Sequence, residues 1–402
     1  MKTLRFLIMA WLFLAGLIMT GLVGPNRMAV REEFGLSETG FGAGVAVTQA
    51  SAALAVLVIA HWLARWKPVT ILMAGLSVVI LGFLIVSLSH HLAALIVGWT
   101  LVTAGLTMGM ITNNISMDLW PQNPRRGVVL LHGFNAGGKV VGPLIAAVFL
   151  GVGYRLSFVA VGAITLAVLV VCLLLRRHGD VAVTRSIVDP GSGLRVLRRP
   201  AFWLFMLWIG MIAGGEAAFA TLLPTYFKEG LGYSAQVGTL ALTVHLLGLT
   251  AGRFASAWLG HRAGNGTVIA LCLATGVFVF PVMFFGNQPA ILVSLFVFGL
   301  MFSSTWPSFY AAAAEWLPDC RHMMPYGSAL GNYVVMGLCI LGSSMIADHN
   351  LWLAMFFGPA VLWLFGAMYL IRWLVVRTPT VAGICDRAAA LGATDAHERH
   401  MR

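Results

Sequence analysis

Charged residues are scarce in this chain of 402 residues. Asp, Glu, Lys and Arg together make up 10% of it, whereas a soluble domain contains roughly 25%. Hydrophobic residue types make up 59%, and the mean hydropathy is +0.90. This composition excludes an ordinary soluble domain and predicts that most of the chain lies in lipid.

Cysteine is also scarce. The five cysteines form neither a Cys-x-x-Cys pair nor a cluster with histidine, so no disulfide framework and no metal site are predicted. The sequence also lacks the nucleophile–base and metal-ligand spacings that enzymes use. We therefore expect a protein without a cofactor, a metal or catalytic residues.

What the chain has instead is about twelve apolar runs, each near the roughly 20 residues that cross a bilayer. Each run must be a helix, because lipid offers no partner to backbone N–H and C=O groups. Six runs precede the charged stretch 176–199 and six follow it. We predict an all-α membrane protein with twelve transmembrane helices in two six-helix halves with pseudo-two-fold symmetry. Its parts are an N-terminal half (1–175), a cytoplasmic linker (176–199), a C-terminal half (200–376) and a cytoplasmic tail (377–402).

The two halves repeat each other in the same order. Gly35 and Gly232 end similar charged segments 197 residues apart, and Arg65 and Arg262 close the following runs at the same offset. The segment that begins at Leu131 corresponds, at an offset of 194, to the one that begins at Pro325. Two membrane-embedded repeats with a substrate site between them are typical of a transporter that works by rocking.

The net charge of +11 follows from topology. With both termini in the cytoplasm, 20 of the 25 Lys and Arg lie on that side, which is the positive-inside pattern and needs no nucleic acid. The short loops indicate a monomer in a bacterial inner (cytoplasmic) membrane, surrounded by lipid. Arg27, Arg31 and Lys228 fall outside; we expect them to be solvated loop charges, although they could attract an anion.

The architecture resembles the major facilitator superfamily over residues 1 to about 376. The loop after the second run partly matches that superfamily's G-x-L-x-D-R-x-G motif: Arg65 stands in the position of its arginine, but Ala64 replaces its aspartate. The matching loop of the second half keeps Arg262 and Gly264. The resemblance implies a gating role for Arg65 and Arg262, and we place Asp118 and Arg253 at the same cytoplasmic gate.

A narrower resemblance is to the fucose–galactose–glucose proton symporters and their sugar-permease-like relatives. It rests on four stretches: Asn113-Asn114 with Leu131-His132-Gly133-Phe134 and Gly142-Pro143, Gly215-Glu216 with Leu223-Pro224, Gly252-Arg253, and Trp306-Pro307 with Leu317-Pro318. The resemblance implies proton-coupled uptake of a sugar-like solute. The acidic residues that fucose permeases carry in helices 1 and 4 are missing, because the first acid is Glu32 in one and Asp118 in the other.

Ionisable residues within a span are costly and mark functional candidates. Glu216 falls in the seventh run and either binds a sugar hydroxyl, carries a proton, or forms a structural ion pair between the halves. Lys139 falls near mid-depth in the fifth run. It either binds a carboxylate or phosphate, pairs with Glu216, or snorkels on a helix that Gly137, Gly138 and Gly142 pack tightly.

The other candidates are polar or aromatic. His132 and Asn135 share the helical face of Lys139. His245 is a proton-titrating gate or a hydrogen-bonded structural histidine. Asn113 and Asn114 either bind sugar hydroxyls in a wet cavity or join helices. The aromatic faces of Trp306, Tyr310 and Tyr333, near Asn332, either stack on a sugar ring or fill the core, and Pro307 is expected to break its helix.

The sequence therefore predicts a secondary transporter for a small polar solute, with a proton as coupling ion. Lys139 and the missing acids favour an anionic sugar. The alternative is a proton-coupled exporter of amphipathic drugs or lipids, since Gly138-x-x-x-Gly142-Pro143 partly matches the helix 5 motif of antiporters. A non-transporting sensor is a third class, disfavoured by a tail of 26 residues.

Overall fold

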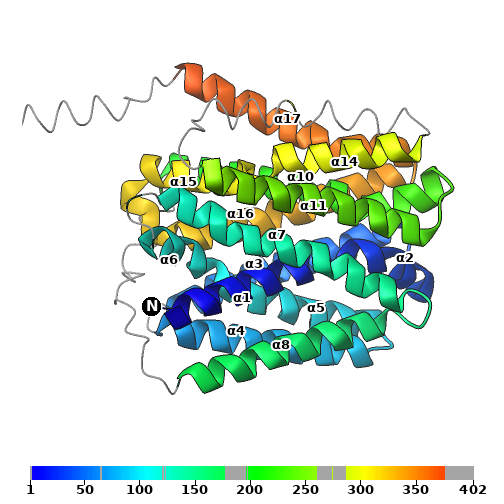
Figure 1. Ribbon diagram of the computed structural model, residues 1–402, viewed down its shortest axis with the longest axis horizontal. Helices are drawn as coiled ribbons and strands as arrows, with labels where there is room; N and C mark the ends of the chain where they lie inside the picture. The colour runs from blue at the N-terminus through cyan, green and yellow to red at the C-terminus, as the bar shows by residue number, and fades with distance from the viewer. Residues whose placement is uncertain are drawn as a thin grey trace, which may run out of the picture.

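The computed structural model describes residues 2–63, 66–119, 122, 124–176, 196, 198–259, 274 and 287–375. These residues form one bundle of long helices that run side by side (Figure 1). Arg65, Arg262, the ninth predicted run at 266–285, most of the linker and the tail lie outside the described residues.

The residues up to 176 form eight α-helices and one short 3-10 helix. In chain order they are α1 (Lys2–Met19), α2 (Val23–Phe34), α3 (Glu38–Leu63), α4 (Pro68–Leu88), α5 (Leu92–Thr107), η1 (Met108–Ile111), α6 (Thr112–Leu119), α7 (Pro124–Phe149) and α8 (Arg155–Arg176).

The residues from 198 onward repeat this pattern within the described part of the chain. In order they form α10 (Pro200–Thr225), the π-helix η2 (Tyr226–Gly230), α11 (Ala235–Leu259), α14 (Gln288–Phe302), α15 (Thr305–Trp316), the 3-10 helix η4 (Pro318–Met323), α16 (Met324–Ala347) and α17 (Leu351–Val375).

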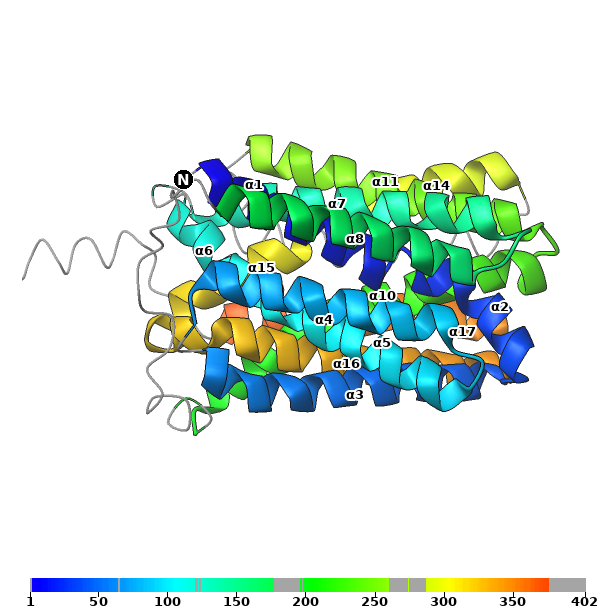
Figure 2. The ribbon, with the colours of Figure 1, turned by 90° about the horizontal axis from the view of Figure 1, so that it is seen from below.

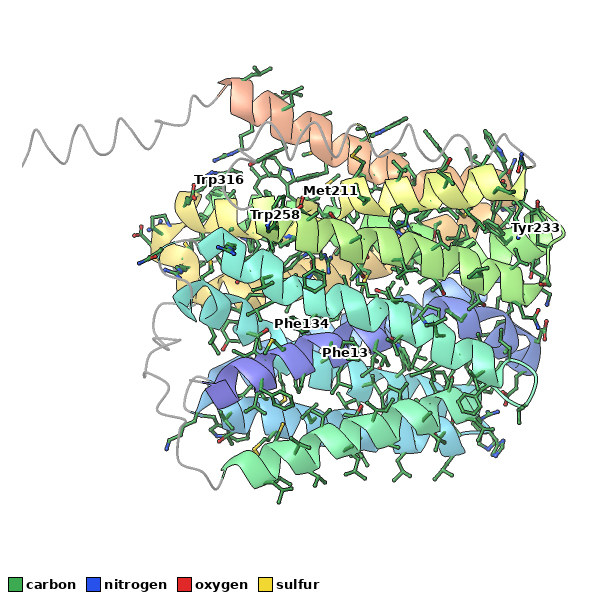
Figure 3. All side chains as sticks on the ribbon, viewed as in Figure 1. Phe13, Phe134, Met211, Tyr233, Trp258 and Trp316 are labelled. Carbon is green, nitrogen blue, oxygen red and sulfur yellow. The ribbon has the colours of Figure 1, made fainter. Side chains whose placement is uncertain are left out.

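The all-α membrane fold is confirmed, since the described residues are helical apart from turns and short connections. Nine helices in this part of the chain are long and apolar enough to cross a membrane, and α3 and the shorter α5 occupy two further predicted positions. Apolar side chains project outward from α8 at one edge of the bundle, where Leu166 and Leu174 are exposed (Figure 3). The full count of twelve stays a prediction.

The glycines of the sequence repeat have matching backbone conformations. Gly35 has φ of 60° and Gly232 has φ of 72°, a left-handed region that favours glycine. Each therefore turns the chain sharply between two spans at the same place in its repeat. We call the end of the bundle that holds both turns the η2 end and the opposite end the α6 end; they lie at the right and the left of Figure 1.

Close glycine contacts join equivalent helix pairs in the two halves. A Cβ atom on Gly138 of α7 would lie 1.9 Å from the carbonyl oxygen of Phe13 on α1. A Cβ on Gly331 of α16 would lie 2.1 Å from the carbonyl oxygen of Met206 on α10. Small residues let membrane helices approach closely, so α1–α7 and α10–α16 are both tightly packed pairs. Phe13 lies beside α7 in Figure 3.

The two halves meet along two helix pairs. α3 packs on α16, and α7 packs on α11, as both views of the ribbon show (Figures 1 and 2). At the first contact, a Cβ on Gly42 would lie 2.6 Å from the side chain of Ser344. This arrangement brings α7 and α10, which carry the predicted charged residues, to the interior between the halves.

We expect Gly138→Ala to destabilise the bundle, because the added methyl group overlaps the Phe13 carbonyl and overpacking costs about 1–3 kcal/mol. The matched control is Gly137→Ala, whose Cβ would lie 3.9 Å from the Phe13 ring. Thermal unfolding in detergent, followed by size-exclusion chromatography, should show a lower Tm only for the first variant. Equal Tm values would show that α1 and α7 are not packed this closely.

Candidate functional site

A cavity of about 130 Å³ lies between the two halves, large enough for several water molecules. It is lined from the N-terminal half by α1, the α5–α6 region and α7, and from the C-terminal half by α10, α11, α15 and α16. Seven of the ten predicted substrate residues line it: Lys139, Glu216, His132, Asn135, Trp306, Asn332 and Tyr333.

An ion pair joins the halves inside this cavity. The Nζ atom of Lys139 on α7 donates to Oε1 of Glu216 on α10, and both side chains are at least nine-tenths buried. The two residues are 77 positions apart in the chain, so only the packing of the halves brings them together. Of the sequence alternatives, the structure shows the pairing of Lys139 with Glu216.

Arg253 of α11 also reaches the cavity, although the sequence predicted it only as a gate residue. Its Nε donates to the carbonyl oxygen of Ser303 at 3.0 Å, and its Nη1 donates to the carbonyl oxygen of His132 at 2.9 Å and to Oδ1 of Asn135 at 3.2 Å. Arg253 is 3% exposed. It therefore links α7 to the C-terminal half beside the Lys139–Glu216 pair.

An aromatic wall closes another side of the cavity. The ring of His132 lies 4.7 Å from the ring of Trp306, centroid to centroid, and Trp306 stacks on Tyr310 at 5.4 Å. Polar groups fix the first two rings: His132 Nε2 is 2.8 Å from Oδ1 of Asn113, and Trp306 Nε1 donates to Oδ1 of Asn332 at 3.3 Å. The wall offers both a flat apolar face and hydrogen-bonding groups.

Interrupted helices flank the cavity at equivalent positions in the two halves. The 3-10 segment η1 separates α5 from α6, and residues 303 and 304 separate α14 from α15. Pro307 lies in the first turn of α15, so the break expected near Trp306 is confirmed. Irregular backbone at membrane depth is tolerated where it is buried or lines a cavity, and paired breaks in two repeats point to a binding site.

The remaining predicted residues lie elsewhere or outside the described residues. His245 is fully buried in the C-terminal half, 5.4 Å from the ring of Phe219 and 5.0 Å from that of Phe298. Tyr310 supports Trp306 from behind without lining the cavity. The side chains of Asn114 and Asp118 on α6 lie outside the described residues, as do Arg65 and Arg262.

The lining of the cavity also includes side chains that were not selected from the sequence, among them Trp11 and Thr112. Trp11 of α1 lies against Gly109, where a Cβ would be 1.4 Å from the indole nitrogen, and Thr112 begins α6. The Trp-Leu-Phe segment that begins at Trp11 recurs at Trp203 in the second half of the sequence. Trp203 is 53% exposed, so this repeat gave no sign that Trp11 reaches the site. No group of three metal-ligating side chains occurs among the described residues.

A second charged network closes the η2 end. Arg27 and Arg31 of α2 both pair with Glu38 of α3, and Arg31 extends to Oε1 of Glu229 on η2 at 3.3 Å. Arg27 also donates to the hydroxyl of Ser344 on α16 at 2.9 Å. Arg27 is fully buried, so the prediction of a solvated loop charge is wrong for it. The network holds α2 and α3 against the C-terminal half.

Asp348 adds to this closure from the α16–α17 loop. Its carboxylate accepts the backbone N–H groups of Glu38 and Thr39, both at 2.9 Å, at the first turn of α3. Although burial opposes the charged form, hydrogen bonds from Thr39 and Glu38 hold the pKa of Asp348 below its ordinary value. An anion at a helix N-terminus is favoured by the helix dipole and by the unpaired N–H groups.

Comparison with known proteins identifies relatives of the same architecture. The family model of the Major Facilitator Superfamily matches residues 6–274 and 211–390. The crystal structure of the superfamily transporter FucP, in an outward conformation, superposes with a TM-score of 0.62 at 17% identity, over 90% of this chain and 98% of FucP. The sialic acid transporter NanX of Escherichia coli (strain K12) is 24% identical over 198 residues. That match spans 47% of this chain and about half, 48%, of NanX.

We expect Lys139→Met and Glu216→Gln each to lower the free energy of unfolding by roughly 3–5 kcal/mol, because each leaves a buried partner charge uncompensated. The double variant, which removes both charges, should be destabilised less than the sum of the two. Thermal unfolding of the four proteins in detergent measures the coupling. Additive effects would contradict a direct pair.

We expect Asp348→Ala to open the η2 end more often, because the N–H groups of Glu38 and Thr39 lose their acceptor. The rate of maleimide labelling at Ser344→Cys, read at that peptide by mass spectrometry, should rise roughly fivefold for the loss of about 1 kcal/mol. The control is Asn350→Ala in the same loop, which caps only its own helix through the N–H of Leu353. Equal rates in both variants would show that the hydrogen bonds of Asp348 do not hold the η2 end closed.

The closure of the η2 end by the Asp348 carboxylate should depend on pH. Because the pKa of Asp348 is lowered in the closed form, its stabilisation is present above the ordinary Asp range and is lost as pH falls through the lowered value. Because maleimide reacts with the thiolate, the two proteins are compared at the same pH. Asp348→Ala should label position 344 faster than the protein with Asp348 at neutral pH, and this difference should disappear as pH falls through the lowered pKa.

Proposed function

Because the chain belongs to the Major Facilitator Superfamily, we propose that it is a secondary transporter that takes up a small, sugar-like anion by alternating access, coupled to protons. The residues up to 175 and from 200 to 376 move against each other as its two halves, and both termini lie on the cytoplasmic side of the inner membrane. The observation that carries the proposal is the buried ion pair between Lys139 and Glu216, within a cavity between the halves.

The cavity favours a polar solute over a hydrophobic one. Lys139, Glu216 and Arg253 converge on it, and Asn135, Asn332 and His132 add hydrogen-bonding groups. Buried polar groups of this kind favour ligands that can pair with them, because an apolar ligand would leave them unsatisfied. The aromatic face of Trp306 suits the apolar face of a sugar ring.

The location of the ion pair links binding to motion. Lys139 belongs to the N-terminal half and Glu216 to the C-terminal half, so any rocking that separates α7 from α10 stretches or breaks the pair. A substrate that enters the cavity and separates this pair would free the Glu216 carboxylate to bind a proton. We propose that Glu216 carries the coupled proton in this way.

The match to a sialic acid transporter supports a sugar acid as the substrate class. It agrees with the site, where a lysine and an arginine meet one glutamate. The alternative, an exporter of amphipathic drugs or lipids, gains no support from this charge balance, since many such compounds are lipophilic cations.

A thermal-shift screen of the purified protein tests the substrate class. The panel contains neutral hexoses, sugar acids including sialic acid, sugar phosphates and lipophilic cations. A ligand that binds only the folded state raises Tm by mass action. We expect a shift with a sugar acid that disappears in Lys139→Ala while the variant remains folded, because Glu216 is then left to neutralise Arg253 and the cavity loses its net positive charge. A shift with lipophilic cations alone would favour the exporter.

Uptake into proteoliposomes tests the coupling ion. With a sugar acid found in the screen, an inward proton gradient should drive accumulation in the wild type. Glu216→Gln mimics the protonated acid, so we expect it to lose gradient-driven accumulation but to keep exchange of labelled for unlabelled solute. Accumulation that survives in Glu216→Gln would place the coupled proton on another residue.

A further inference from the structure

Lys139 and Arg253 are the two buried cations of the cavity, and their surroundings differ. Lys139 is neutralised by the carboxylate of Glu216. Every hydrogen bond that Arg253 makes within the described part of the chain goes to an uncharged acceptor. The sequence pattern pointed to Lys139 as the residue that binds an anion. In the tertiary arrangement Lys139 holds the direct contact with Glu216, and Arg253 makes no direct contact with a carboxylate among the described residues.

We propose that Arg253 is the residue that selects for negative charge, and that it binds the carboxylate of the substrate directly. This inference rests on the proposed transport function and assigns its charge selectivity to one side chain. Lys139 and Glu216 then serve the coupling between binding and motion rather than the choice between charged and neutral solutes.

The charge balance of the cavity supports this assignment. Lys139 and Arg253 contribute two positive charges and Glu216 one negative charge, so these lining groups carry a net charge of +1. An ionised side chain within a membrane span is expensive unless an opposite charge or a water-filled cavity compensates it. A monoanionic substrate supplies the missing charge, whereas a neutral sugar leaves the guanidinium without a counter-ion.

The local geometry prepares Arg253 for a carboxylate. The break between α14 and α15 presents the Ser303 carbonyl oxygen to Nε, and α7 supplies the two acceptors of Nη1. These bonds hold the guanidinium plane in one orientation at the wall of the cavity. A planar guanidinium held in place loses little freedom when a carboxylate binds, which favours Arg over Lys at such a position.

The position of Arg253 also places the anion between the two halves. Its anchors are Ser303 from the C-terminal half and His132 and Asn135 from the N-terminal half. His132, whose carbonyl oxygen anchors Arg253, also packs its ring against Trp306 in the aromatic wall. A sugar acid can thus place its carboxylate at Arg253 and its ring against Trp306.

The test compares a sugar acid with its uncharged methyl ester. The probes are sialic acid and galacturonate, each beside its ester, and the readout is the apparent Kd from thermal-shift titration of the full-length protein. A charge-assisted hydrogen bond discriminates by roughly tenfold to 100-fold. We expect the wild type to prefer the acid by about tenfold or more, and Arg253→Gln to bind acid and ester within about twofold of each other.

Two further variants separate the roles of the cations. Arg253→Lys keeps the charge without the fixed plane, so it should bind more weakly yet still prefer the acid; it keeps the test informative if Arg253→Gln does not fold. The double variant Lys139→Ala/Glu216→Ala keeps the net charge of +1 and should also prefer the acid.

Loss of the preference in the double variant, with its retention in Arg253→Gln, would overturn the assignment and return charge selection to Lys139. Should Arg253→Gln prove unfolded, loss of the preference in Arg253→Lys would also overturn it. If the proposed transport function is wrong, the wild type should bind neither the sugar acids nor their esters, which distinguishes that outcome from a wrong assignment of Arg253. Equal binding of acid and ester by the wild type would overturn the charge selection alone and leave a sugar transporter.

Discussion

A charge buried in a lipid-embedded bundle must meet an opposite charge, and this constraint organises the centre of the molecule. Lys139 and Glu216 lie on different halves, so each is stable at its depth only while the halves are in contact. The charge state of the cavity therefore depends on how α7 and α10 pack against each other. Arg253, fixed by carbonyl groups of both halves, adds a second buried cation, so the charged groups that line the cavity carry a net charge of +1.

The η2 end obeys the same constraint with a different result. Arg27 is fully buried there, but Glu38 compensates it and Ser344 accepts a further hydrogen bond. Asp348 approaches the first turn of α3 from the other half. This end is therefore held by paired charges, whereas the charged groups that line the cavity carry a net charge of +1.

The internal repeat gives both halves the same scaffold but not the same chemistry. Gly138 and Gly331 bring their helices together in equivalent ways, and both halves interrupt a helix beside the cavity. Yet Lys139 corresponds to Tyr333 at the repeat offset of 194, and the buried Trp11 corresponds to the exposed Trp203. Equivalent helix pairs thus keep a close glycine contact, although not at the same repeat position, while the side chains that face the cavity have diverged.

Hydropathy by itself determined the all-α membrane fold, because lipid offers no partner to polar backbone groups. Helical periodicity determined the face shared by His132, Asn135 and Lys139. The partner of Lys139 and the place of Arg253 could not be read in this way, since they depend on contacts 77 and 121 residues apart. His245 was selected from the sequence but lies in an aromatic core away from the cavity. A histidine within a span looks the same in the sequence whether it packs in a core or works in a gate. Only the tertiary structure decided which buried charges pair directly and which cation is bound by uncharged acceptors.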